Sequence, residues 1–151
     1  NPENELRIIA RMPLINELEL SQNIELTTNS IKADDFLIIS RTSGFIIANN
    51  VEIKNLDIEH SGNGFIDIKS KKDSEIGETL TTNNSNSGKL NLFAYRVKNG
   101  NITNTGSGQS DVNPIESIKA KITGSGDIRY ISRPNVESEE ITGSGRLLVI
   151  N

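Results

Sequence analysis

The serines of two Thr-Gly-Ser-Gly segments have a type and spacing that could support covalent chemistry. Ser125 and Ser144 each lie between two glycines, and His60 is the only histidine in the 151-residue chain. A serine nucleophile on a strand-to-helix turn needs the pattern Gly-x-Ser-x-Gly and a histidine that accepts its proton. Neither segment has this spacing. We therefore interpret both segments as structural corners, expect His60 to be an exposed corner residue, and predict no catalytic residue.

A carboxylate after a Gly-Ser-Gly could bind calcium. Asp127 stands at such a position, as in the calcium-binding β-roll, where stacked carboxylates and carbonyl oxygens supply hard ligands. The equivalent positions of the other repeats carry no second carboxylate: Phe45, Phe65, Lys89, Gln109 and Arg146. Because one carboxylate makes no ladder of oxygen ligands, we predict neither a metal site nor a cofactor.

Glycoside hydrolysis is a third chemistry to consider, because it needs two carboxylates roughly 5–10 Å apart. Asp57 or Glu59 could face outwards on the coil next to Asp67. Exposed charges alternate along any strand that has one face in solvent. We therefore expect no enzyme activity, and a small glycan-active enzyme is kept only as an alternative.

The glycines of these segments belong to a repeat. A small polar residue, a Gly and then β-branched or aromatic residues recur, most clearly at 123–128 and 142–147. The copies are 18 to 24 residues apart, measured between the structural glycines that open each following strand: Gly44, Gly64, Gly88, Gly108, Gly126 and Gly145. A period near 20 with alternating apolar residues predicts an all-β solenoid, in which each repeat is one coil. We expect these glycines at corners, where a positive φ favours Gly.

The whole chain, 1–151, is predicted to be a single solenoid domain of about seven coils. A polar loop is expected around 69–87, because 69–73 and 81–87 are poor in apolar residues. This loop falls in the widest gap between two corner glycines.

Three further segments carry local signals. Asn99-Gly100 is typical of a tight turn. The proline and glycine that bound 115–122 leave too little length for a stable helix, so short strands are expected there. Residues 3–12 could form a strand or a capping helix.

The composition excludes several classes of function. A net charge of −4 lacks the basic field of a nucleic-acid-binding protein. The absence of cysteine excludes disulfides and thiol chemistry. No apolar run approaches the roughly 20 residues of a transmembrane helix, and no apolar leader is present, so we expect any export signal to have been removed. The 22 Ile and 19 Asn favour strands and turns.

Six aromatic residues are available for contact with a ligand. The four Phe are expected inside the coil, as large apolar side chains usually are. Tyr95 and Tyr130 are the predicted surface contacts, because each has a polar end that can stay in water while the ring packs on a ligand. That ligand would be a surface glycan or an extracellular protein.

The C-terminal repeats resemble a known family. Residues 122–136, Ile-Thr-Gly-Ser-Gly-Asp-Ile-Arg-Tyr-Ile-Ser-Arg-Pro-Asn-Val, are followed by Ile-Thr-Gly-Ser-Gly-Arg-Leu at 141–147. Together they are similar to the paired Gly-Ser-Gly ending of the head GIN domain family, whose members are labelled auto-transporter adhesins. Residues 18–26 resemble its early strand, without a Gly that is common there. The resemblance implies a right-handed, single-stranded β-helix, exported to the envelope of Gram-negative bacteria, and it brings no catalytic residues.

The leading hypothesis is a non-enzymatic cell-envelope module, an adhesin that presents a rigid β-helix surface for glycan or protein contact. The first alternative is a self-assembling structural solenoid. Residues 147–150 are four consecutive apolar residues, and an exposed strand at a coil end can recruit another chain. A homo-oligomer through this C-terminal strand is therefore a second predicted partnership. The glycan-active enzyme is the last alternative.

Overall fold

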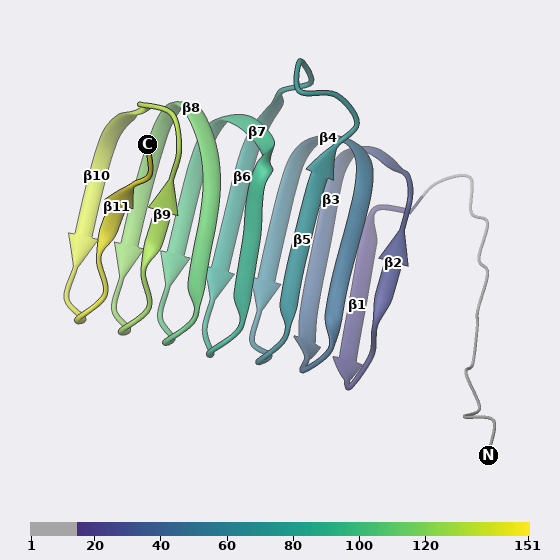
Figure 1. Cartoon of the computed structure of the whole chain (residues 1–151), viewed down its shortest axis with the longest axis horizontal. Coiled ribbons are helices and arrows are strands. Elements are labelled where there is room, and N and C mark those ends of the chain that lie inside the picture. Colours follow the sequence, from purple (N-terminus) through teal and green to yellow (C-terminus); the bar gives the residue numbers. More distant parts are fainter. Residues whose placement is uncertain (1–14) are drawn as a thin grey trace.

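The chain winds as a β-solenoid of about seven turns (Figure 1). The structure, a computed structural model, describes residues 15–151, and the segment 3–12, where a strand or capping helix was expected, lies outside them. The regular structure of the described residues is all β-strand, which confirms the predicted fold class. The strands are β1 (Glu17–Gln22), β2 (Leu26–Thr28), β3 (Ile31–Thr42), β4 (Phe45–His60), β5 (Phe65–Ser70), β6 (Gly77–Asn84), β7 (Lys89–Asn104), β8 (Gln109–Ile122), β9 (Ile128–Tyr130), β10 (Asn135–Ile141) and β11 (Leu147–Val149).

Each strand pairs in parallel with strands one coil away. The long strand β4 pairs through its first residues with β2 and β5, and through its last residues with β3 and β6. A long strand therefore bends and contributes to two sides of the molecule. We call the side built from β2, β5, β9, β11 and the first parts of β4, β7 and β8 the β5 face. The side that contains β1, β6 and β10 is the β10 face (Figure 1).

The core is a continuous apolar stack inside the coil. Ile46 pairs with Leu26 on one side and with Ile66 on the other, and Ile66 pairs with Leu90. Every second side chain of a strand points into the coil, so these four coils place an apolar residue at the same inward position; the next coil places the buried Ser110 there. Complete burial of one such side chain stabilises the fold by about 1.5–3 kcal/mol.

The polar loop is shorter than the segment 69–87 that the sequence predicted. Residues 77–84 form β6, which pairs with β4 and β7, and the projecting loop spans 71–76 (Figure 1). A polar strand is possible here because Leu80 fills the core while Thr81 and Asn83 face solvent. Loop composition and outward-facing strand composition are alike, so a count of apolar residues does not separate them.

Asn99-Gly100 forms no tight turn, because both residues lie inside β7. A two-residue turn joins antiparallel neighbours, whereas Gly100 finds its strand partners one coil away, in Leu80 and Ile118. Residues 115–122 form the last part of β8, so the expectation of a strand there is confirmed.

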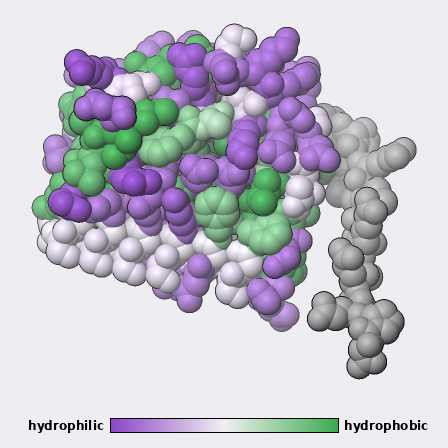
Figure 2. All heavy atoms as spheres, viewed as in Figure 1, coloured by the Kyte–Doolittle hydropathy of each residue, from purple (hydrophilic) through white to green (hydrophobic). Residues whose placement is uncertain are grey.

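The corner glycines are required by close stacking, and the expectation of a positive φ is wrong. No glycine of the chain has a positive φ. A Cβ on Gly126 would instead approach the carbonyl oxygen of Gly108 to less than the 3.0 Å that real Cβ contacts keep, and Gly64 stands in the same relation to the Gly44 oxygen. At these corners, the backbone of one coil therefore packs directly against the backbone of the preceding coil. Figure 2 shows the corners as a pale band along the lower edge of the molecule.

We predict that Gly126→Ala destabilises the protein by roughly 3 kcal/mol or more, because the clash is with a backbone atom that cannot rotate away. Urea denaturation followed by circular dichroism measures this effect. Gly100→Ala is the matched control: its Cβ would meet Pro114 Cβ at 3.3 Å, a contact that a small shift relieves. Equal losses for both variants would contradict the stacking argument.

Candidate functional site

The structure does not bring Ser125 or Ser144 together with His60. Ser125 and Ser144 are exposed at two late corners, whereas His60 is 1% exposed and lies inside the coil. The expectation that His60 is an exposed corner residue is wrong, because its position in the repeat points inwards. Its register partners are Ser40 and Asn84, which are also buried.

His60 belongs to an internal polar column that spans the glycine corners. Its Nε2 donates to the Gly64 carbonyl oxygen at 3.3 Å. The amide of Asn84 donates to the Gly88 oxygen at 2.9 Å in the same way, and Asn104 repeats the bond one coil later. Burial in this column lowers the pKa of His60, because the charged imidazolium would lose its hydration. The neutral His60 side chain therefore has a structural role: its hydrogen bond to the Gly64 carbonyl oxygen stabilises the corner.

The candidate carboxylates are also kept apart. Asp57 and Glu59 are exposed on the part of β4 that pairs with β6, whereas Asp67 is buried on the β5 face. The Asp127 carboxylate accepts hydrogen bonds from the backbone and the side chain of Arg146, at 2.8 and 3.2 Å, and the side-chain bond lowers the pKa of Asp127. Within residues 15–151 no three His, Cys, Asp or Glu side chains are grouped as metal ligands.

The two tyrosines differ in exposure. Tyr95 is 1% exposed and its hydroxyl donates to the Ile53 carbonyl oxygen at 3.1 Å, so the expectation that Tyr95 is a surface contact is wrong. A hydroxyl that reaches a backbone carbonyl satisfies its polar end without water. Tyr130 in β9 is half-buried against the core, and its role as a surface contact stays a prediction.

A shallow depression lies on the β5 face, near the N-terminal end of the molecule. Phe45 and Phe65 are register partners on adjacent coils, and both are half-buried with outward-facing rings. Together with Ile47 they provide the apolar part of the depression. Figure 2 shows a green hydrophobic patch directly above the pale band of corners, on the side of the N-terminus.

The expected burial of the phenylalanines holds for Phe36, which is 2% exposed, and is wrong for Phe45, Phe65 and Phe93, which are half-buried. A signal for the exposure of Phe45 and Phe65 was present in the sequence. Both directly follow a corner glycine, at the position where later repeats carry hydrophilic side chains: Lys89, Gln109, Asp127 and Arg146. Since these four would not be buried together, the position itself faces outwards.

A polar wall runs beside the two rings, formed by the small residues of the corners. Ser87 Oγ donates to Asn63 Oδ1 at 2.8 Å, and Ser43 Oγ makes a longer bond of 3.4 Å to Asn23 Oδ1. All four side chains are exposed and line the depression. The depression thus has an apolar floor and a wall of amide and hydroxyl groups.

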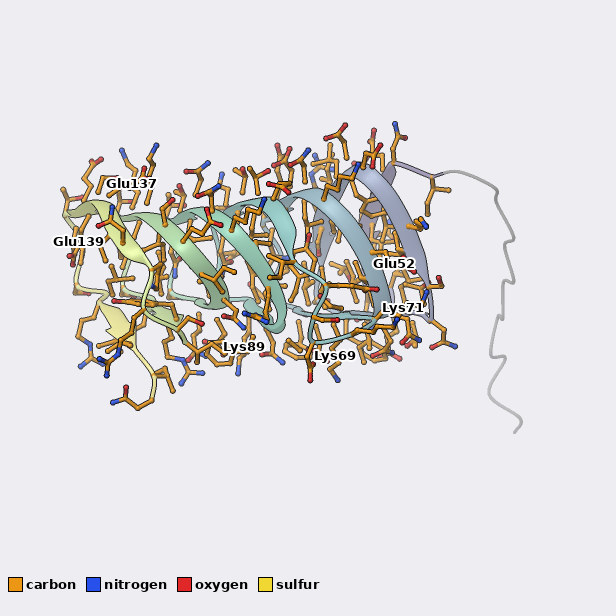
Figure 3. The ribbon with its side chains drawn as sticks, turned by 90° about the horizontal axis from the view of Figure 1, so that it is seen from above. Glu52, Lys69, Lys71, Lys89, Glu137 and Glu139 are labelled. Atoms are coloured by element: carbon orange, nitrogen blue, oxygen red, sulfur yellow. The ribbon has the colours of Figure 1, made fainter. Side chains whose placement is uncertain are left out.

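Charged side chains lie next to the depression on the same face. Asp67 accepts a 2.7 Å hydrogen bond from the amide of Asn91 and forms an ion pair of 3.0 Å with Lys69. Asp111, 1% exposed, accepts two 2.7 Å bonds from Arg129. Figure 3 shows Lys69 and Lys89 along this side of the solenoid and Glu137 and Glu139 on the opposite side, at the C-terminal end. Both buried carboxylates are therefore neutralised within the protein.

A second hollow of about 510 Å³ lies near the projecting loop, lined in part by Tyr95, Ile76 and Gly77. Two lysines beside it are paired, Lys54 with Asp34 at 2.7 Å and Lys71 with Glu52 at 2.6 Å, whereas Glu75 Oε2 is buried without a hydrogen-bond partner among the described residues. No helix within residues 15–151 has the length and apolar character to cross a membrane.

These features define a parallel β-solenoid that carries a small amphipathic depression on one face. Residues 1–134 match the model of the family described as "putative auto-transporter adhesin, head GIN domain". The chain belongs to this family, as its C-terminal repeats led us to expect. A search of curated proteins finds no match.

Two crystal structures share the fold. A putative adhesin from Bacteroides fragilis superposes with a TM-score of 0.77 at 20% identity, over 91% of this chain and 62% of that one. A putative adhesin from Parabacteroides merdae gives a TM-score of 0.58 at 23% identity, over 90% of this chain and 64% of that one. The chain thus spans less than two thirds of the length of either protein.

The buried imidazole predicts a specific pH dependence. The pKa of His60 is lowered on folding from about 6.5 in the unfolded chain, so the unfolded state binds more protons. Stability is therefore complete above the unfolded pKa and is lost as the pH falls through 6.5 towards the folded value. In His60→Asn, which copies Asn84 and Asn104 of the same column, this loss should be absent. Thermal denaturation from about pH 8 to about pH 5.5 tests the difference; parallel curves for the two proteins would contradict it.

Proposed function

We propose that the protein is a non-enzymatic adhesion module, exported to the surface of a Gram-negative bacterium, that contacts a glycan or a protein through its β5 face. Membership of the adhesin family supports adhesion at a cell surface and a role without catalysis. The two structures of similar fold are named as putative adhesins and come from Bacteroides and Parabacteroides, which is consistent with a bacterial surface protein.

The observation that carries the proposal is the exposed pair Phe45 and Phe65. Aromatic rings next to amide and hydroxyl groups are typical of contact surfaces, because one site then offers both apolar area and hydrogen bonds. The scaffold beneath is rigid, since each coil is bonded to the next along nearly its whole length. Binding would therefore cost little conformational entropy.

An array of glycans and extracellular-matrix proteins tests the proposal. We expect a dose-dependent signal from the wild type and its loss in Phe65→Gln. Gln occupies the equivalent outward position at Gln109, so the substitution should leave the fold intact. Tyr130→Ala tests the remaining predicted contact on β9, and a loss there alone would move the contact from the depression to β9. Absence of any signal from the folded protein would overturn the proposed function.

A second candidate function, self-assembly, is favoured by the C-terminal coil. Within residues 15–151, β10 pairs only with β8 and β11 only with β9. Three large hydrophobic side chains are exposed there: Val136 at 40%, Ile141 at 38% and Val149 at 48%. Free strand edges with apolar side chains can pair with another chain.

Sedimentation velocity over a wide range of concentration tests self-assembly. The wild type should sediment faster as its concentration rises, and Val149→Lys should sediment as a monomer throughout, because a charge on the edge strand opposes pairing. Lys54→Ala is the control, because Lys54 is exposed on β4, far from the C-terminal coil. This variant should behave as the wild type. A monomeric wild type at every concentration would overturn this candidate.

A further inference from the structure

We propose that the depression on the β5 face is a subsite for one pyranose ring of an uncharged glycan. The rings of Phe45 and Phe65 would form its floor, and Asn63 and Ser87 its wall. This inference rests on the proposed adhesive function, and it commits that function to one class of ligand.

The repeat does not require two aromatic rings at this outward position. The same outward column continues from Phe65 to Lys89 and Gln109, and those polar side chains are accommodated on the same backbone with the same pairing. Exposing the apolar surface of the two rings to water is unfavourable. Polar residues at the same positions would avoid this cost. Exposed apolar patches beside polar groups are a common feature of ligand-binding sites, and the subsite is proposed on that ground.

The wall presents both kinds of hydrogen-bonding group at once. Because Ser87 donates its hydroxyl hydrogen to Asn63 Oδ1, the geometry leaves the amide N–H groups of Asn63 as donors and the lone pairs of Ser87 Oγ as acceptors. This single hydrogen bond links the two side chains across adjacent coils. A ligand with alternating hydroxyl groups would find a donor and an acceptor side by side.

A pyranose ring has this combination of surfaces. One face of the ring is covered by C–H groups and packs on an aromatic ring, while the hydroxyl groups project around the edge. In the depression the C–H face would rest on Phe45 and Phe65, and the edge would reach the wall. Floor and wall belong to adjacent stretches of the same coils and line one depression, so a single sugar would contact both.

The charges of the depression favour an uncharged ligand. Glu25 and Lys89 both line it, one anion and one cation. Lys89 Nζ forms an ion pair with Asp111 Oδ2 at 3.6 Å, and the Lys89 side chain is 46% exposed. An acidic sugar would be attracted by Lys89 and repelled by Glu25, with no net gain. Because the positive charge of Lys89 is balanced by Glu25, the site has no preference for a phosphate or a carboxylate.

The size of the apolar floor argues for a sugar over a protein. It consists of Phe45, Ile47 and Phe65, all of them half-buried. A stable protein interface covers about 800 Å² on each partner and usually centres on a larger apolar patch. The apolar area of three half-buried side chains is much smaller than such an interface. It is closer to the area of one sugar ring.

Titration followed by NMR tests the subsite. The probes are the methyl β-glycosides of glucose, galactose and N-acetylglucosamine and methyl α-mannoside, added to protein labelled at isoleucine methyl groups. We expect at least one probe to shift the Ile47 methyl signals, with saturation transferred most strongly to the C–H protons of one sugar face. Phe65→Leu keeps apolar bulk but removes the ring, and binding should weaken about tenfold.

Phe93→Leu is the matched control. Phe93 is another half-buried ring of the β5 face, but it lies under the guanidinium of Arg129, 5.8 Å from its centroid, and outside the depression. Its replacement should leave sugar binding unchanged. Unperturbed Ile47 signals with every probe, or equal binding by wild type and Phe65→Leu, would overturn the inference. Protein hits on the array that Phe65→Gln abolishes, with no sugar binding, would overturn the subsite while the adhesive function stands.

Discussion

The stacking of backbone directly on backbone at the corners is the constraint on which the rest of the structure depends. A corner carbonyl oxygen of one coil occupies the space that a side chain of the next coil would need, as between Gly108 and Gly126. Each coil can therefore sit on its neighbour in only one register. Because side chains alternate along a strand, this single register decides which residues enter the core and which face solvent.

The internal column of His60, Asn84 and Asn104 follows from the same constraint. The tight corner turns backbone carbonyls such as that of Gly88 towards the interior, where they need donors. Amide side chains from the strand before the corner supply these donors. The last coils place Ile122 at this position instead, so the column ends within the solenoid. These three buried polar side chains thus help to hold the corners of the fold.

The outward positions carry no such constraint, and this is where function can vary. Phe65, Lys89 and Gln109 occupy one column on the same backbone. The β5 face can therefore change its chemistry from coil to coil without a change of fold, which suits a surface module of an adhesin family. The shared fold of the Bacteroides and Parabacteroides proteins, at 20% and 23% identity, agrees with a fold that tolerates wide variation of sequence.

The sequence by itself determined the repeat, the all-β solenoid and the family, because glycine spacing and the alternation of apolar residues are local patterns that survive without coordinates. The outward direction of Phe45 and Phe65 was also contained in it, since the equivalent residues Lys89 and Gln109 are polar. Only the tertiary structure decided why the corner glycines are glycines, because the clash that excludes a side chain involves atoms about 20 residues away in the chain. It also decided the burial of His60 and Tyr95, whose hydrogen-bond partners are backbone carbonyls that a sequence does not place in space.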